Sequence, residues 1–127
     1  MDCLELDAAG AVVAPGFINV LSQAYESLQR DPRGLSDLYQ GVTTEVFGEG
    51  YSLGPVEGRA LEIAQVDTER SGVRHDWRRT TDFLDHMADS GVGPNLATFV
   101  GVDNLRTAYA GYDNRPLTED ELRGACD

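Results

Sequence analysis

Apolar runs and turn signals alternate along the first half of the chain. The run from Phe17 to Leu21 is broken only by Asn19, and such a continuous run predicts a strand buried on both faces. Leu35 to Gln40 carries its apolar residues on one side, which predicts a short helix that ends at Gly41 in a left-handed cap. The β-branched and aromatic run from Val42 to Phe47 predicts a second strand.

The second half has weaker patterns at first and clearer ones later. Residues 51–79 show no clear period and many charges, so we expect a long excursion with one helical turn around residues 60–64. An amphipathic helix is predicted from Thr81, and a third strand is predicted at Leu96 to Val100. A loop should follow this strand, and the capping box at residues 118–121 predicts a last helix.

This order of strands and helices favours parallel βαβ units and therefore an α/β fold. The last helix reaches the C-terminus at once, so no later element can pack against it. A helix this short is not stable alone. We therefore expect the chain to be part of a larger architecture.

Charge excludes two classes of partner. The 127 residues carry a net charge of −12, while 41% are hydrophobic and 25% charged, as in an ordinary globular protein. An acidic surface repels phosphate backbones and anionic membranes, so we expect no nucleic-acid or membrane partner. The plain interpretation of the charge is that it keeps the protein in solution.

The cysteines and the chain start point to a location. Cys3 and Cys126 lie near opposite ends, so the C-x-x-C spacing of a zinc ribbon or a redox motif does not occur. Sparse cysteine use suggests a reducing compartment. Residues 1–10 lack the basic and apolar regions of a signal peptide, and no stretch approaches a membrane span. A cytoplasmic location is the expectation.

Three stretches carry a family pattern. They are residues 7–20, which contain Ala-Pro-Gly-Phe-Ile, residues 40–48, which read Gln-Gly-Val-Thr-Thr-Glu-Val-Phe-Gly, and residues 99–122, with Phe-Val-Gly and Arg-Pro-Leu-Thr-Glu-Asp-Glu-Leu at their ends. In this order they resemble the N-acyl-D-amino-acid deacylases (D-aminoacylases) of the amidohydrolase superfamily. The resemblance matches them to the passage from a small β-sandwich domain into the first barrel strand, to the second strand, and to the third strand with its helix.

The resemblance implies a fold and a division of the chain. Residues 1–14 would be a strand remnant of the β-sandwich domain, and residues 15–127 the N-terminal part of a (β/α)8 barrel of the metal-dependent hydrolase type. A complete barrel of this kind needs about 250 residues and places its active site at the C-terminal ends of the strands. The family's later metal-binding histidines and its catalytic aspartate have no counterpart here, so no catalytic residue is assigned.

The family's metal site is only partly represented. Its first strand ends in His-x-His, but Leu21 and Gln23 occupy the matching positions, and Val102 stands where a histidine often follows the third strand. Where the family commonly has Gly-Asn-Cys-Gly with a cysteine ligand, this chain has Gly-Glu-Gly, which places Glu49 at the ligand position. A carboxylate is an acceptable zinc ligand. The alternative is that Glu49 is a solvated loop residue.

Other polar residues are weaker candidates. Tyr51 and Ser52 follow the Gly-Glu-Gly turn, where residues of a barrel often line the pocket, so they are candidate substrate-binding residues; packing within the loop is the alternative. His75 and His86 lack a partner at metal-ligand spacing. Neither has an evident orienting partner, so a Ser-His-Asp arrangement is not supported.

The resemblance implies that the parent protein hydrolyses linear amide bonds, with an N-acyl-D-amino acid as small-molecule substrate. Zinc would be the implied cofactor, activating a water molecule and polarising the carbonyl group. The alternatives are a catalytically inactive amidohydrolase-like binding module and a fragment without a function of its own. The isolated chain should expose unpaired apolar strand edges and self-associate through them.

Overall fold

A computed structural model describes residues 5–126. Its three strands form a parallel sheet in the order β1-β2-β3, with β1 at Phe17–Asn19, β2 at Val42–Phe47 and β3 at Asn95–Thr98. The helices are α1 (Tyr25–Arg30), α2 (Leu35–Tyr39), α3 (Gly58–Ser71), α4 (Thr80–Asp89), α5 (Val102–Ala110) and α6 (Glu119–Cys126). The predicted α/β fold with parallel βαβ units is confirmed.

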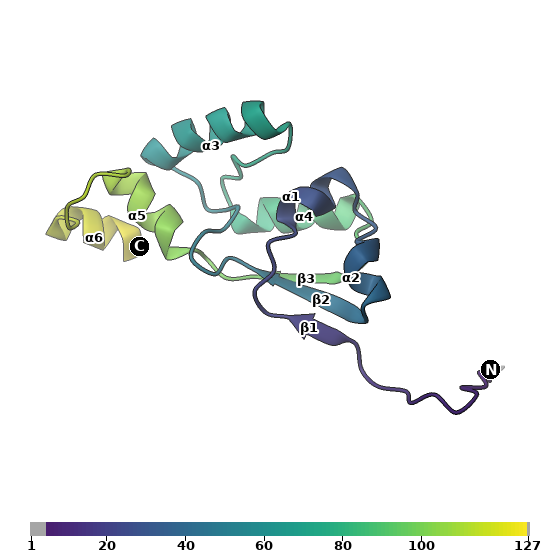
Figure 1. The fold of residues 1–127 in the computed structure, drawn as a ribbon. Coiled ribbons are helices and arrows are strands. Elements are labelled where there is room, and N and C mark those ends of the chain that lie inside the picture. Colours follow the sequence, from purple (N-terminus) through teal and green to yellow (C-terminus); the bar gives the residue numbers. More distant parts are fainter. Residues whose placement is uncertain (1–4, 127) are drawn as a thin grey trace.

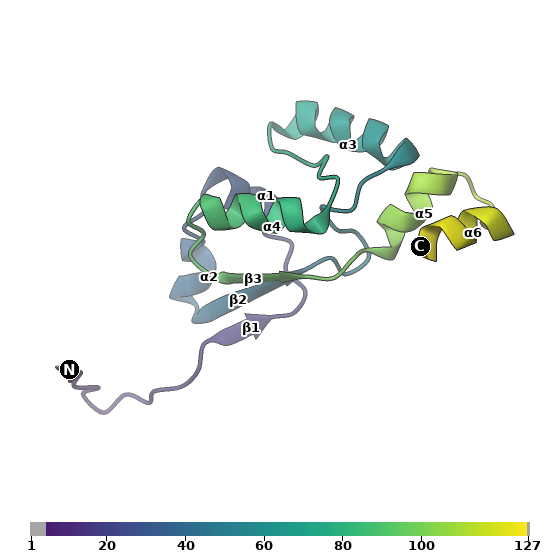
Figure 2. The same cartoon turned by 180° about the vertical axis from the view of Figure 1, so that it is seen from behind.

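The helices cover only one face of the sheet. Helices α1, α2 and α4 lie over that face, α3 lies farther from the sheet, and α5 and α6 lie beyond the end of β3 (Figures 1 and 2). The opposite face carries no helix in either view. Consecutive parallel strands with helices on one side are the arrangement of a barrel wall, so the fold is consistent with part of a barrel. No helix within residues 5–126 has the length and apolar character that a membrane crossing requires.

The core lies between the sheet and the helices. Phe47 on β2 packs against Phe83 on α4 with their ring centroids 6.1 Å apart, and Leu28, Trp77 and Met87 complete the buried cluster. Aromatic pairs of this edge-to-face kind add to the free energy gained by burying apolar area. The predicted amphipathic helix from Thr81 is confirmed, because α4 buries this apolar face.

A glutamate lies in the same layer. Side chains two residues apart on a strand share a face, so Glu45 points toward the helices as Phe47 does. Its exposed fraction is 0%, and neither carboxylate oxygen has a hydrogen-bond partner among the described residues. Burying an unpaired carboxylate costs free energy, so Glu45 weakens the core in which it lies.

Three helices differ from the prediction. Helix α1 was not expected, α3 has 14 residues where one turn was predicted, and α5 replaces a predicted loop. Helix α3 buries only Ala60 and Ala64, and α5 buries Asn104, Thr107 and Ala110. Small or polar residues at helical spacing give almost no hydrophobic period, so a search for apolar stripes does not detect these helices.

The last helix begins as predicted. The Glu121 N–H donates to Thr118 Oγ1 at 3.3 Å, and the Thr118 N–H donates to Glu121 Oε2 at 2.8 Å, which together form the capping box. The Arg115 guanidinium also binds Glu121, and these hydrogen bonds lower the pKa of Glu121 to about 2. No later element was expected to pack against this helix; α6 instead packs against the preceding helix α5.

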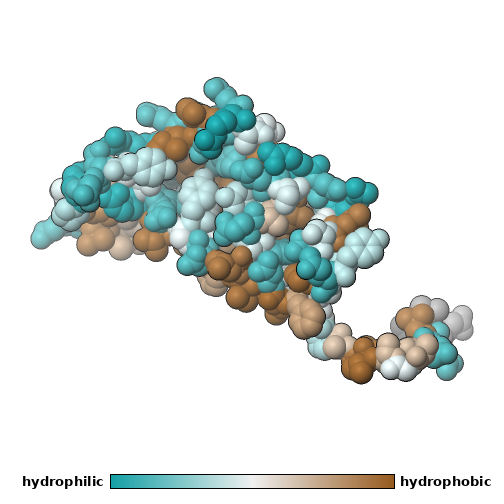
Figure 3. All heavy atoms as spheres, in the orientation of Figure 1, coloured by the Kyte–Doolittle hydropathy of each residue, from teal (hydrophilic) through white to brown (hydrophobic). Residues whose placement is uncertain are grey.

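Strand β1 is exposed, although burial on both faces was predicted. Phe17 is 67% exposed and Ile18 is 61% exposed. Hydrophobic atoms lie along the lower edge of the molecule, where β1 runs, while the helices above are mostly hydrophilic (Figure 3). The apolar residues of β1 are typical of a strand that other elements cover. Within residues 5–126, however, no element covers this strand.

The segment before β1 extends away from the rest of the molecule (Figure 1). Residues 5–16 contain a turn at Ala9 and Gly10 and no strand. Residues 1–4, where part of the predicted β-sandwich remnant falls, lie outside the described residues. The assignment of residues 1–14 to a β-sandwich domain therefore stays a prediction.

Candidate functional site

The C-terminal ends of the three strands meet at one edge of the sheet, since the strands are parallel. The residues that follow them are Leu21 and Gln23 after β1, Glu49 after β2 and Val102 after β3, and all four side chains are exposed. The predicted metal ligand, Glu49, therefore lies at the same edge of the sheet as the three residues that replace the family's histidines. This edge is where a barrel enzyme places its site.

The turn after β2 depends on glycine. Gly48 has a φ of 88°, and a Cβ atom there would overlap the carbonyl oxygen of Phe99, which follows β3. Only glycine accommodates both the left-handed conformation and this close approach. The turn therefore presents Glu49 to solvent while it holds the ends of β2 and β3 together.

Ser52 and Asn104 join the β2 loop to helix α5. The Asn104 side-chain oxygen accepts a hydrogen bond from the Ser52 N–H at 2.7 Å, and its side-chain nitrogen donates to the Ser52 carbonyl at 2.6 Å. The Ser52 hydroxyl donates to the Gly54 carbonyl at 2.6 Å and accepts from the Gly101 N–H at 2.9 Å. Ser52 is 2% exposed. Its hydrogen bonds are all internal, so it fixes the loop and does not face a ligand.

A pocket of about 430 Å³ lies between α3 and α5, next to this loop. Helix α3 supplies an apolar wall of Ala60, Ile63 and Ala64. The polar lining comes from Tyr51, Asp67, Asp103, Asn104, Arg106, Thr107 and Tyr112. An apolar wall with a few polar groups is the usual composition of a small-molecule site. Of the three predicted site residues, only Tyr51 lines this pocket.

Tyr51 stays protonated over a wide pH range. Burial, followed by the nearby Tyr25, Asp67, Tyr112 and Glu26, raises the pKa of the Tyr51 hydroxyl to about 12. Desolvation and negative neighbours both disfavour a phenolate. At neutral pH the Tyr51 hydroxyl is therefore available as a hydrogen-bond donor to a ligand in the pocket.

We expect Tyr51 to titrate near pH 12, above the usual value of 10. Because the folded state holds this proton more tightly, stability should fall as pH rises from 10 toward 12. Phenolate absorbance at 295 nm, compared between the chain and its Tyr51→Phe variant, measures the midpoint. Tyr39→Phe, at an exposed residue of α2, is the matched control, and a Tyr51 midpoint near 10 would contradict the expectation.

The described residues do not form a metal site. Among residues 5–126, no three side chains of histidine, cysteine, aspartate or glutamate lie close enough together to hold a metal ion. Zinc sites in proteins usually take three or four such ligands. Glu49 can therefore supply at most one ligand, and the remaining ligands would have to come from outside these residues.

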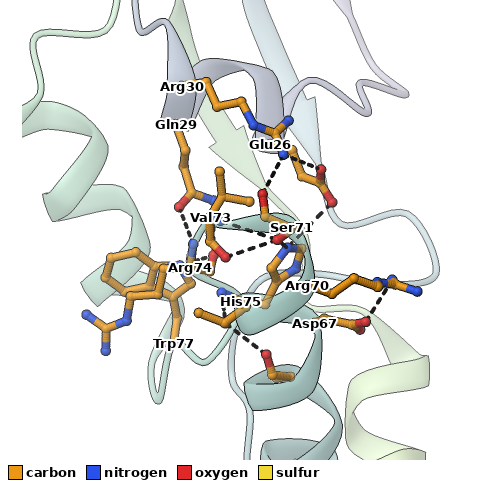
Figure 4. Close-up of polar contacts among 12 residues, drawn as sticks. Glu26, Gln29, Arg30, Asp67, Arg70, Ser71, Val73, Arg74, His75 and Trp77 are labelled. Atoms are coloured by element: carbon orange, nitrogen blue, oxygen red, sulfur yellow. Dashed lines mark hydrogen bonds and ion pairs between the residues drawn. The ribbon is translucent and has the colours of Figure 1, made fainter.

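His75 belongs to a separate polar cluster, shown in Figure 4. Its ring is buried, with Nε2 3.1 Å from Ser71 Oγ and 3.5 Å from Glu26 Oε1. The expectation that His75 lacks an orienting partner is wrong. A Ser-His-acid relay needs the serine and the acid on different ring nitrogens, whereas both lie on Nε2 here. The cluster joins α1 to the end of α3, a structural role that His86, exposed on α4, does not share.

The residues that α5 adds to the pocket were not among the predicted site residues. Asp103, Arg106 and Thr107 lie in a segment predicted as a loop, so their common helical face was not recognised. A polar periodicity could have shown it, since Asn104 and Thr107 recur three residues apart.

Comparison with known proteins identifies relatives of the same kind over most of the chain, although no family model matches. D-aminoacylase from Alcaligenes xylosoxydans xylosoxydans is 34% identical over 119 residues, which cover 93% of this chain and 24% of that protein. N-acyl-D-aspartate deacylase from the same organism is 30% identical, covering 91% of this chain and 23% of that protein. The chain thus spans about a quarter of the length of these relatives.

Solved structures agree with the sequence relatives. A crystal structure of D-aminoacylase, described as defining a novel subset of amidohydrolases, superposes with a TM-score of 0.68 at 28% identity. The match covers 86% of this chain and 23% of that one. A further D-aminoacylase structure with the same scores concerns that enzyme's binuclear metal centre. The resemblance to the D-aminoacylases of the amidohydrolase superfamily is therefore confirmed, for the part of such an enzyme that this chain spans.

Proposed function

We propose that this chain is a barrel segment of a metal-dependent amidohydrolase that cleaves the linear amide bond of N-acyl-D-amino acids. The observation that supports this most strongly is the joint match in sequence and in fold to D-aminoacylase. The segment supplies three parallel strands whose C-terminal ends carry the Gly-Glu-Gly turn, next to the pocket that Tyr51 lines. The activity belongs to the whole enzyme, since the described residues do not hold a metal alone.

The metal would be zinc, and Glu49 would be its one ligand from this segment. The exposed position of Glu49 at the end of β2 favours this role, and a carboxylate oxygen is an accepted zinc donor. When bound, zinc would supply an activated water molecule for hydrolysis. Within this segment Tyr51 would contact the substrate, and Ser52 would hold the loop in place.

The segment can be tested in a chimera. Residues 15–127 would replace the matching segment of the Alcaligenes D-aminoacylase, and hydrolysis of N-acetyl-D-methionine and bound zinc would be measured together. We expect measurable hydrolysis, and we expect Glu49→Gln to lower zinc content and activity by at least tenfold.

The matched control is Glu57→Gln, which removes an exposed carboxylate beside α3. Zinc content that is unchanged by Glu49→Gln would eliminate Glu49 as a ligand. A folded chimera that binds zinc and hydrolyses no amide would argue against the enzymatic function.

The second candidate function is a catalytically inactive binding module. Leu21 and Gln23 favour it, because neither side chain replaces the imidazoles that the family has at the end of the first strand. A folded chimera that binds neither zinc nor any other metal would support this alternative.

We further propose that the isolated chain self-associates through its sheet. Strands β1 and β3 are the outer strands of the sheet, and Phe17 and Ile18 are exposed. Unpaired apolar strands are templates for another chain. We expect Ile18→Lys to convert oligomers to monomers in size-exclusion chromatography with light scattering. Val66→Lys, at an exposed position of α3, should leave the mass unchanged, and a monomeric unsubstituted chain would contradict the proposal.

A further inference from the structure

We propose that the pocket between α3 and α5 binds a small organic cation, an ammonium group on an apolar carbon skeleton. The pocket has an internal volume of about 430 Å³, which is within the range of small-molecule sites. Its occupant is inferred from the charges and rings that line it. The cation would be a ligand other than the N-acyl-D-amino acid, whose carboxylate the two aspartates of this lining would repel. The proposal therefore does not depend on amide hydrolysis, and it needs no metal.

Two carboxylates give the lining a negative charge. Asp67 binds Arg70 through Oδ1 at 2.8 Å, on the exposed side of α3, and its Oδ2 has no hydrogen-bond partner among the described residues. Asp103 has no ion-pair partner within the same part of the chain. Asp67 Oδ2 and the Asp103 carboxylate are therefore available to an ammonium group, which can donate up to three hydrogen bonds.

Arg106 is the one cation in the lining, and three of its five N–H groups are already in use. Its Nη1 donates to the Gly111 carbonyl at 2.9 Å, and its Nη2 donates to the carbonyls of Asp113 at 2.5 Å and Arg115 at 2.8 Å. These bonds tie the guanidinium to the loop after α5. The group therefore closes this loop and does not offer the bidentate fork that would bind a carboxylate or phosphate ligand. With Asp67 and Asp103, the lining keeps a net charge of −1.

Two aromatic rings and an apolar wall complete the match to an organic cation. Tyr51, in the loop after β2, and Tyr112, in the loop after α5, both line the pocket. Aromatic faces attract cations, and the attraction is stronger where water is excluded. The Ala60, Ile63 and Ala64 side of α3 fits a hydrocarbon body. A hydrated metal ion would gain nothing from this wall, whereas an alkyl- or arylammonium ion would bury apolar area against it.

Three matched probes test the proposal on the full 127-residue chain. Phenethylammonium, 2-phenylethanol and phenylacetate share a ring and differ in charge. By isothermal titration calorimetry we expect phenethylammonium to bind about tenfold more tightly than 2-phenylethanol, and phenylacetate to bind most weakly. The double variant Asp67→Asn with Asp103→Asn should remove the preference for the cation and keep the binding of the alcohol.

The control is Asp85→Asn with Asp89→Asn, which removes two exposed carboxylates from α4 and should keep the tenfold preference. Chemical-shift mapping on the unsubstituted chain should centre on Tyr51, Ile63 and Thr107. Equal affinity for the ammonium and the alcohol, an equal loss in the control variant, or shifts centred elsewhere would each overturn the proposal. The mapping decides the matter even if the Asp67→Asn, Asp103→Asn variant does not fold.

Discussion

Replacing Asn104 with alanine is expected to lower the free energy of unfolding by about 3 kcal/mol, since a buried polar group left without a partner costs about 1–3 kcal/mol. The Asn104 amide accepts from the Ser52 N–H and donates to the Ser52 carbonyl, and both residues are buried. Alanine would leave both backbone groups of Ser52 unpaired and would open a cavity beside them. Urea denaturation followed by circular dichroism measures the change as a lower midpoint at an unchanged slope.

The control for this substitution is Asn114→Ala, at an exposed residue of the loop after α5, which should change stability by less than about 0.5 kcal/mol. Both variants are measured with Ile18→Lys present, so that self-association does not obscure unfolding. A midpoint shift for Asn104→Ala no larger than that of Asn114→Ala would show that the Ser52–Asn104 contact does not hold the loop. In that case the contact would not fix the position of Tyr51 at the pocket either, because Tyr51 directly precedes Ser52.

The strands were predictable because their signal is local. Val42 to Phe47 is rich in β-branched and aromatic residues, and β2 has these bounds. The exposure of β1 was not predictable, since burial depends on which other elements are present. Phe17 and Ile18 have a composition suited to a buried strand, yet the described residues provide no second layer for that face. A sequence pattern specifies which face prefers an apolar environment and cannot show whether anything covers it.

The site was predictable only where strand ends define it. Tyr51 follows the Gly-Glu-Gly turn at the end of β2, so the barrel rule alone placed it near a pocket, and it does line one. The same rule selected Ser52, whose side chain instead turns inward to the α5 loop. The rule that barrel sites lie at strand ends predicts which part of the chain is near the site, but it does not predict which way a side chain points. The contributions of Asp67 and Asp103 depend on how α3 and α5 pack together, which is a long-range contact that neither helix encodes alone.

Replacing Glu45 with methionine is expected to raise the free energy of unfolding by about 2 kcal/mol, because replacing buried charged groups by apolar ones of similar volume is often stabilising by about 1–4 kcal/mol. Glu45 has an exposed fraction of 0%, and its carboxylate oxygens have no partner among the described residues. Methionine adapts to irregular cores and would extend the apolar cluster around Phe47. Urea denaturation should show a higher midpoint for Glu45→Met.

A second substitution separates the cost of the charge from that of the polar atoms. Glu45→Gln keeps the shape and removes the charge, but it leaves an amide to be satisfied, so its stability should lie between those of the chain and of Glu45→Met. Glu62→Met, at an exposed residue of α3, is the control and should change stability by less than about 0.5 kcal/mol. If Glu45→Met instead destabilised the chain by about 3 kcal/mol or more, the carboxylate would have a buried cationic partner in solution, since breaking a buried ion pair costs about 3–5 kcal/mol. A glutamate on the helix-facing side of a central strand would then hold the barrel wall together by charge, and its conversion to methionine would remove that contact.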